Sequence, residues 1–141
     1  MFRIFKENDF MFLKDIISEY MGHEITDSDL KNRMEYIRNS FSENLYIFED
    51  NGLSKAIIAT RIRENIEENS KFLEISLIIT KSEFRNQGIG KQMISFAEEK
   101  AKEIGCIGLW LVSGFGREEE AHKFYKNLEF VITGYRFRKV F

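Results

Sequence analysis

The sequence predicts a mixed α/β fold in which an apolar strand runs through a glycine turn into a long helix. Three observations lead to this prediction. Leu73–Thr80 is apolar apart from three polar residues and has the length of a strand. The turn follows in Arg85-Asn-Gln-Gly88-Ile-Gly90-Lys. Apolar residues then recur at helical spacing from Ile89 to Ile104, and Gly105 is typical of the residue that ends a helix.

Periodicity and turn residues predict the remaining elements on both sides of this unit. Before it we expect a short strand over Phe2–Phe5 and two amphipathic helices over Glu7–Met21 and Thr26–Phe41, the second capped by Thr26 or Asp27. A hairpin then joins two strands, Asn44–Glu49 and Leu53–Arg63, across Asn51-Gly52. After it come a strand covered on both faces, a helix and a pair of strands about Thr133-Gly134: Cys106–Val112, Arg117–Asn127 and Phe130–Phe141. The total is about seven strands and four helices.

Length and composition predict one domain over residues 1–141 with a large core. The chain has 141 residues, 43% of them hydrophobic, including 14 Phe. Its net charge of −2 argues against a nucleic-acid partner bound through phosphates. A lone cysteine, Cys106, cannot form an intrachain disulfide, and no signal peptide or membrane segment is evident. We therefore expect a soluble, cytoplasmic protein with no membrane partner.

The glycine turn has the chemistry of an anion site. The first backbone N–H groups of a helix lack intrahelical partners, and the helix dipole adds partial positive charge there. Gly88 and Gly90 have no Cβ, so a pyrophosphate can approach these amides directly. Lys91 adds a full positive charge. A tight connection between strand and helix is the alternative interpretation of the same residues.

Taken together, these elements resemble the GNAT superfamily of acyl-CoA-dependent N-acyltransferases. Two motifs carry the resemblance: Arg85-x-x-Gly88-x-Gly90 after a strand, and Ala121-x-x-Phe-Tyr125-x-x-x-x-Phe130 on the late helix. The chain lacks the third glycine of the dinucleotide fingerprint and the Gly-Lys-Ser/Thr of a P-loop. The resemblance implies a mixed, mostly antiparallel sheet of about seven strands with about four helices and a splayed V between two central parallel strands.

The resemblance also implies acetyl-CoA as cosubstrate and no metal. In such proteins the glycine motif holds the CoA pyrophosphate with its backbone amides, and the pantetheine arm inserts beside the preceding strand. Transferred to this chain, the cofactor-binding residues are Ile78, Ile79, Arg85, Asn86, Gln87, Gly88, Ile89, Gly90 and Lys91.

Two residues are candidates for catalysis. The family's late-helix tyrosine falls on Tyr125, which would protonate the departing thiolate; packing beside Phe124 is the alternative role. Glu74 lies on the strand before the glycine motif and would take the proton of the amine, or is simply solvated at a strand end. By strand alternation Glu74 shares a face with Ser76, Ile78 and Thr80. Glu129 stands where the family usually has a glycine.

The expected activity is transfer of an acetyl group from acetyl-CoA to a primary amine of a small molecule or peptide. The amine attacks the thioester directly in a ternary complex, and a backbone N–H near Ile79 meets the oxyanion. The alternative from another class is a non-catalytic module that binds or senses acyl-CoA. An acylating toxin that acts on tRNA is disfavoured by the net charge of −2. The identity of the amine is open, and so is a homodimer formed through the edge of the C-terminal strand.

Overall fold

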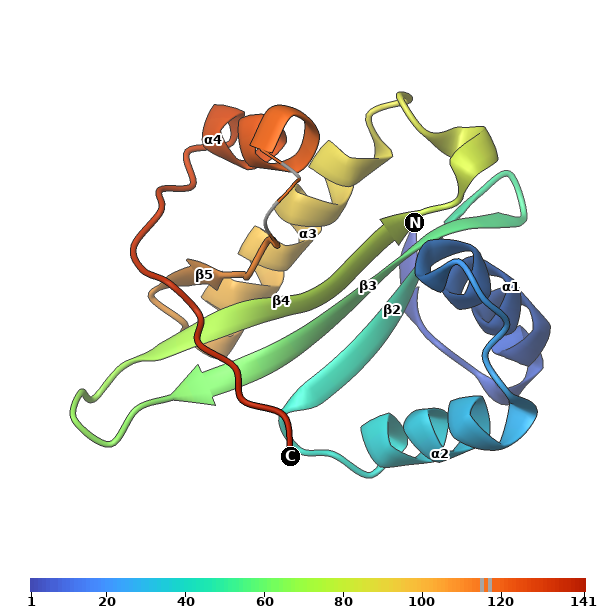
Figure 1. The fold of residues 1–141 in the computed structure, drawn as a ribbon, viewed down its shortest axis with the longest axis horizontal. Coiled ribbons are helices and arrows are strands. Elements are labelled where there is room, and N and C mark those ends of the chain that lie inside the picture. The colour runs from blue at the N-terminus through green and yellow to red at the C-terminus, as the bar shows by residue number, and fades with distance from the viewer. Residues whose placement is uncertain (115, 117) are drawn as a thin grey trace. The chain divides into compact units, whose positions relative to one another are not determined.

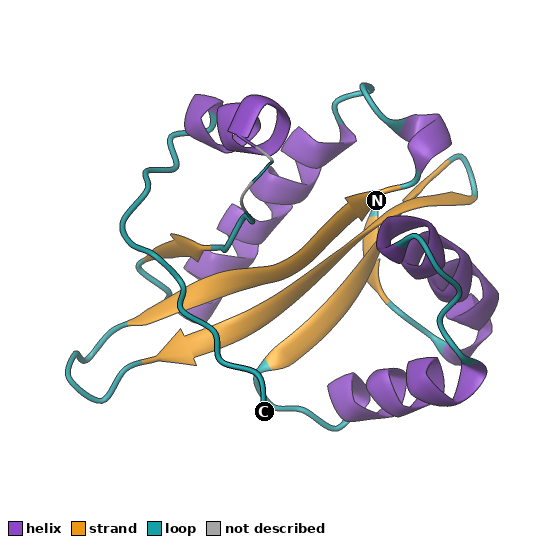
Figure 2. Cartoon of the chain, in the orientation of Figure 1, coloured by secondary structure: helices purple, strands orange, loops and turns teal. Residues whose placement is uncertain are grey.

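The structure, a computed structural model, describes residues 1–114, 116 and 118–141. The chain divides into two units, Met1–Trp110 and Leu111–Phe141. The first unit contains a five-stranded sheet with the strand order β1-β2-β3-β4-β5 and three of the four α-helices. The second contains the late helix and the C-terminal segment. Figure 2 distinguishes the helices, strands and loops of both units.

The sheet is mostly antiparallel. Its strands are β1 (Phe2–Ile4), β2 (Glu43–Asp50), β3 (Leu53–Glu64), β4 (Lys71–Thr80) and β5 (Gly108–Trp110). Neighbours from β1 to β4 pair antiparallel, whereas β4 and β5 pair parallel. The predicted hairpin between β2 and β3 is confirmed. Asn51 and Gly52 both have positive φ, as the two central residues of a type I′ turn require.

The helices are α1 (Phe10–Met21), α2 (Asp27–Arg38), α3 (Ile89–Ile104) and α4 (Lys123–Asn127). The predicted N-cap of α2 is confirmed, because the Thr26 hydroxyl accepts a hydrogen bond from the Asp29 amide. Among the described residues, no helix combines the length and the apolar composition that crossing a bilayer requires.

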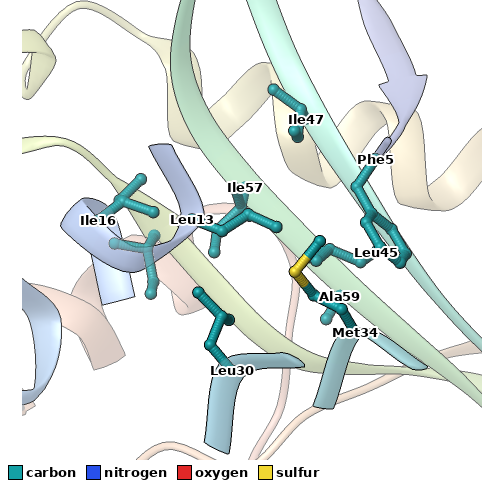
Figure 3. Packing of buried hydrophobic residues seen from close by; sticks show 10 residues of the cluster. Phe5, Leu13, Ile16, Leu30, Met34, Leu45, Ile47, Ile57 and Ala59 are labelled. Carbon is teal, nitrogen blue, oxygen red and sulfur yellow. The ribbon is translucent and has the colours of Figure 1, made fainter. Parts of the chain in front are cut away.

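In the first unit, helices pack on both faces of the sheet (Figure 1). On one face, α1 and α2 bury their apolar stripes against β2 and β3, as Figure 3 shows. The buried residues of this cluster are Phe5, Leu13, Ile16, Leu30, Met34, Leu45, Ile47, Ile57, Ala59 and Ile79. On the other face lies α3, whose Phe96 ring stacks on Phe2 at 4.2 Å and meets the edge of Tyr46 at 4.8 Å. The strands between them are covered from both sides and position the site described below.

A bulge interrupts the alternation of β4 and corrects the predicted face of Glu74. Ala59 lies opposite Leu77 and Thr60 opposite Ile75, so Ser76 is left without a partner on β3. The extra residue turns every earlier side chain of β4 to the other face. Glu74 is therefore on the same face as Leu77 rather than with Ile78 and Thr80, as simple alternation had predicted.

The prediction of seven strands is wrong, since the sheet has five. Residues 130–141 form no strand, although their β-branched and aromatic composition favours one. Composition gives a preference for extended backbone, but a strand also needs a neighbour for its amides and carbonyls. The large apolar side chains of this segment are mostly exposed: Val131, Ile132, Tyr135, Phe137, Val140 and Phe141.

Three smaller boundaries also differ. Strand β5 is three residues long rather than Cys106–Val112, and its Trp110 is 39% exposed, so it is not covered on both faces. Helix α2 ends at Arg38, which leaves Phe41 fully exposed. Regular α-helix begins only at Lys123, after a π-helical turn over Glu118–His122. Phe115 and Arg117, predicted in the turn and at the helix start, lie outside the described residues.

A partly buried ionic network connects the start of the chain to the sheet. Both guanidinium NH groups of Arg3 donate to Asp9 at 2.8 Å, and its Nε donates to Glu49 at 2.8 Å. Asp9 is 6% exposed and also accepts from the Lys6 amide at 2.6 Å. The hydrogen bonds from Arg3 lower the pKa of Asp9.

This network makes the stability of the fold sensitive to acid. A carboxyl whose pKa is lowered by folding contributes stability above its unfolded pKa of about 3.9, and that contribution is lost as pH falls through the folded value. We expect the free energy of unfolding to fall with pH below about 3.9, less steeply in Asp9→Asn. Urea titrations across this range measure the slope. Asp50→Asn, at an exposed ion pair with Lys55, is the control and retains most of the wild-type slope.

Candidate active site

The turn that opens α3 has the backbone conformation that a glycine motif predicts. Gly88 is the N-cap residue with φ 77° and ψ 5°, in the left-handed region that favours glycine. Asn86 also has positive φ, at 61°. A Cβ built on Gly88 meets nothing within 4 Å, so the space before the helix is open.

The backbone amides of this turn are unpaired. Gln92 donates the first helical hydrogen bond, to the Gly88 carbonyl at 3.2 Å. Within the described part of the chain, the amides of residues 86–91 donate to no backbone or side-chain acceptor. Because the helix dipole adds to these donors, this end of α3 favours a bound anion. Lys91 is exposed beside it.

Side chains of α1 hold the loop between β4 and α3. The Glu19 carboxylate accepts from the Ser82 amide at 2.9 Å and pairs with Arg85 at 3.5 Å. Lys81 pairs with Asp15 at 2.7 Å. Arg85 also donates to the Thr80 carbonyl at 3.3 Å. These contacts tie the glycine motif to the sheet before the helix begins.

An open hollow of about 360 Å³ starts at Gly88 and continues along the side of α3 that contacts Phe2 of β1. Its polar lining comes from Lys91, Gln92, Ser95 and Glu99, with the Phe2 and Phe96 rings beside them. The hollow connects the unpaired amides to a surface on which an extended ligand has room.

The edge of β4 that faces away from β3 is free over most of its length within residues 1–110. Pairing with β5 covers three positions, from Phe72 opposite Gly108 to Glu74 opposite Trp110. Beyond Glu74 the described residues of this unit add no partner strand. Ile78 and Ile79 lie in this part of β4, with Ile79 buried under α1 and α2 and Ile78 half-buried. The Lys81 amide donates to the Lys55 carbonyl of β3, so by alternation the N–H and C=O of Ile79 also point to β3. Those of Ile78 point to the free edge, where a ligand can bind as an added strand.

Glu74 is buried, at 7% exposure, and paired with two arginines of β3. Arg63 donates to its Oε2 from Nε at 2.9 Å and to its Oε1 from an NH2 at 3.4 Å. Arg61 donates to Oε2 at 3.4 Å. A buried carboxylate needs such partners, because an unpaired charge in this position is costly.

Tyr125 belongs to the second unit, within α4. Its ring contacts Phe124 at a centroid distance of 5.3 Å and Phe130 at 5.7 Å, both edge-on. The Phe130 amide donates to the Tyr125 carbonyl at 3.1 Å, and Glu129 between them has φ 67°. This left-handed conformation explains why a glycine suits the position that Glu129 occupies.

Within the described residues, neither a thiolate nucleophile nor a metal cluster is favoured. Burial raises the pKa of the Cys106 thiol, which makes a thiolate nucleophile unfavourable. Among the described residues no group of three His, Cys, Asp or Glu side chains could hold a metal ion.

Arg61 and Arg63 are the residues that sequence reasoning missed. A signal for them was present, because Arg-Ile-Arg places two cations on one face of a strand shortly after the apolar run Ala56–Ala59. Their pairing with Glu74 depends on the bulge at Ser76, which periodicity does not reveal.

Comparisons with known proteins agree with this arrangement. The sequence pattern described as "Acetyltransferase (GNAT) family" matches residues 10–130. An uncharacterized N-acetyltransferase of Bacillus subtilis, YhdJ, is 30% identical over 108 residues, which cover 76% of this chain and 75% of that protein. The aminoalkylphosphonate N-acetyltransferase of Salmonella typhimurium is 27% identical over 119 residues, 78% and 77% of the two chains.

The fold has counterparts among solved structures. A GNAT family acetyltransferase of Staphylococcus aureus aligns with a TM-score of 0.81 at 24% identity, over 100% of this chain and 98% of that one. The mixed sheet, the glycine motif at the start of α3 and the family match over residues 10–130 lead to one assignment. The chain belongs to the acetyltransferase (GNAT) family.

Proposed function

We propose that the protein transfers an acetyl group from acetyl-CoA to the primary amine of a small molecule or peptide. The observation that carries the proposal is the row of unpaired amides at the N-terminus of α3, directly after β4. Such a helix end binds a pyrophosphate, and Gly88 leaves the approach open. A relative at 27% identity is named for a small amine substrate, which supports a small-molecule acceptor.

In this proposal the cosubstrate extends from α3 along β4. The CoA pyrophosphate contacts the unpaired amides of Asn86 through Gly90 and the Lys91 charge. The pantetheine arm lies against the free edge of β4 at Ile78 and Ile79. From Thr80 back to Glu74 the strand spans six residues, or about 20 Å at a rise of about 3.3 Å per residue. The thioester and the amine then meet toward the Glu74 end.

The transfer requires that one proton is removed from the amine and that one proton is supplied to the leaving thiolate. An alkylamine is mostly protonated at pH 7, because its pKa is near 10.4. Glu74, directly or through a water, accepts the amine proton, and the amine nitrogen forms a bond to the acetyl carbon. A backbone N–H near Ile79 stabilises the oxyanion. The carbon–sulfur bond then breaks, and Tyr125 protonates the thiolate.

A second candidate function is a module that binds acyl-CoA without turnover. The observation that favours it is the Glu74 carboxylate, both of whose oxygens already accept hydrogen bonds from arginine. A base in this state must exchange one of those bonds for the amine proton. Binding of acetyl-CoA with no thiol release from any amine would support the module.

Thermal unfolding with ligands tests the cosubstrate. A ligand present at 100 times its Kd stabilises the folded state by about 2.7 kcal/mol. We expect acetyl-CoA and CoA to raise Tm clearly and NAD to leave it unchanged. Amines are then screened for release of free thiol from acetyl-CoA. A Tm that no CoA species moves would contradict both candidate functions.

A further inference from the structure

A cluster of alternating charges crosses the sheet on the face that carries α1 and α2. It consists of Glu43 on β2, Arg61 and Arg63 on β3, and Glu74 on β4, with Trp110 of β5 at its end. Arg61 pairs with Glu43 through its Nε as well as with Glu74. Glu74 is buried and Glu43 partly buried, with side chains 9% and 11% exposed, whereas the arginine side chains are 37% and 42% exposed.

The guanidinium groups are held in place but not saturated. Each has five N–H donors, and Arg61 and Arg63 each use two on the carboxylates, so three of each have no acceptor among the described residues. The Arg63 guanidinium also lies over the Trp110 ring at 4.8 Å. The Trp110 ring on one side and the Glu74 carboxylate at one edge fix the orientation of this guanidinium. Such preorganised donors suit a carboxylate, phosphate or phosphonate.

The charge of the cluster argues for the same kind of ligand. Two arginines and two glutamates sum to zero. An ammonium that approaches Glu74 comes near Arg63, whose Nε is only 2.9 Å from the carboxylate oxygen. A simple alkylamine or a polyamine is therefore repelled there. An amine that carries its own anion offsets the repulsion, because its negative group meets the guanidinium donors.

We propose that the acceptor is a short amine with an anionic group a few bonds from its nitrogen, and that Arg61 and Arg63 bind this group. The proposal rests on the proposed acetyl transfer and names its substrate class. Because the Arg63 donors and the Glu74 oxygens lie side by side, the two ends of the acceptor must be close together. Carboxylate, phosphonate and phosphate share the chemistry that the arginines recognise.

The test compares acceptors of similar size with the protein of residues 1–141. β-Alanine and aminoethylphosphonate carry the anion, propylamine lacks it, and diaminopropane replaces it with a second cation. Initial rates of thiol release from acetyl-CoA give kcat/KM for each. We expect the anionic amines to exceed propylamine by roughly 10- to 100-fold, as hydrogen bonds to a charged group provide. Diaminopropane should be the poorest acceptor.

Variants connect this preference to the arginines. Arg63→Gln should remove most of the preference by raising KM for the anionic amines, and Arg63→Lys, which keeps the charge but loses the fork, should restore part of it. Lys100→Gln is the control: Lys100 also pairs with a carboxylate and lies over an aromatic ring, but on α3, which packs on the opposite face. The Tm of each variant without CoA verifies that it is folded, and the increase of Tm with CoA verifies that it binds CoA.

The outcomes separate this proposal from the proposed function. Equal kcat/KM for anionic and neutral amines, or a preference that Arg63→Gln leaves intact, overturns the proposal while acetyl transfer stands. If CoA binds but no amine is acetylated, acetyl transfer is wrong. Calorimetric titration of the CoA complex with β-alanine and with aminoethylphosphonate then decides whether the arginines bind an anionic amine. If either compound binds and Arg63→Gln weakens this binding, the result supports an anion site at the arginines. If neither compound binds, the result overturns the anion site.

Discussion

Replacing Gly88 by alanine is expected to weaken CoA binding roughly 10- to 150-fold, the loss that follows when hydrogen bonds to a charged group are no longer made. Gly88 caps α3 at φ 77°, and the space before its backbone is open. A methyl group at that position stands where the pyrophosphate must approach the amides. It also strains the left-handed backbone by about 1–2 kcal/mol, so the turn itself shifts. Calorimetric titration with CoA measures the change in Kd.

The strain and the loss of the anion site can be separated with a second glycine on the same helix. Gly105 ends α3 at φ 84°, and a Cβ there makes only an ordinary contact with Lys71 at 3.9 Å. It lies about 26 Å from Gly88 at the usual helical rise of about 1.5 Å per residue. Gly105→Ala should lower Tm by a similar few degrees and leave the Kd for CoA unchanged. Equal losses of affinity in both variants would argue against a pyrophosphate site at Gly88.

The central part of the fold could be predicted because its signals are local. The apolar strand before the glycine motif, the period of α3 and the Asn51-Gly52 turn each depend on neighbours in sequence. The segment after Phe130 could not be predicted in the same way. Its composition favours strands, but whether a strand forms depends on a partner that lies elsewhere in the chain.

The candidate site likewise has a part that local sequence predicts and a part that depends on distant residues. Gly88 and its neighbours were predicted because a short motif specifies both the turn and the free amides. The surroundings of Glu74 were not, because the bulge at Ser76 changes the face on which Glu74 lies. That single extra residue brings Glu74 against Arg61 and Arg63, which are more than ten positions away in sequence. Only the register of β3 against β4 makes this contact visible.

Replacing Tyr125 by phenylalanine is expected to lower kcat about 100- to 10,000-fold, the usual contribution of a general acid. The change removes the hydroxyl and keeps the ring, so the contacts with Phe124 and Phe130 at 5.3 and 5.7 Å remain. KM for acetyl-CoA should change little, because the hydroxyl acts on the leaving thiolate rather than on the bound thioester. Steady-state rates of thiol release with a saturating amine measure both constants.

Tyr135→Phe is the matched control, since Tyr135 lies in the same unit and is 81% exposed. It should retain the wild-type kcat and the wild-type Tm. An unchanged kcat in Tyr125→Phe would limit this residue to packing in α4. Combined with an unchanged kcat in Glu74→Gln, that result would remove both proton-transfer groups from the mechanism. Acetyl transfer would then depend on positioning alone, with the amine deprotonated by solvent before it reaches the thioester.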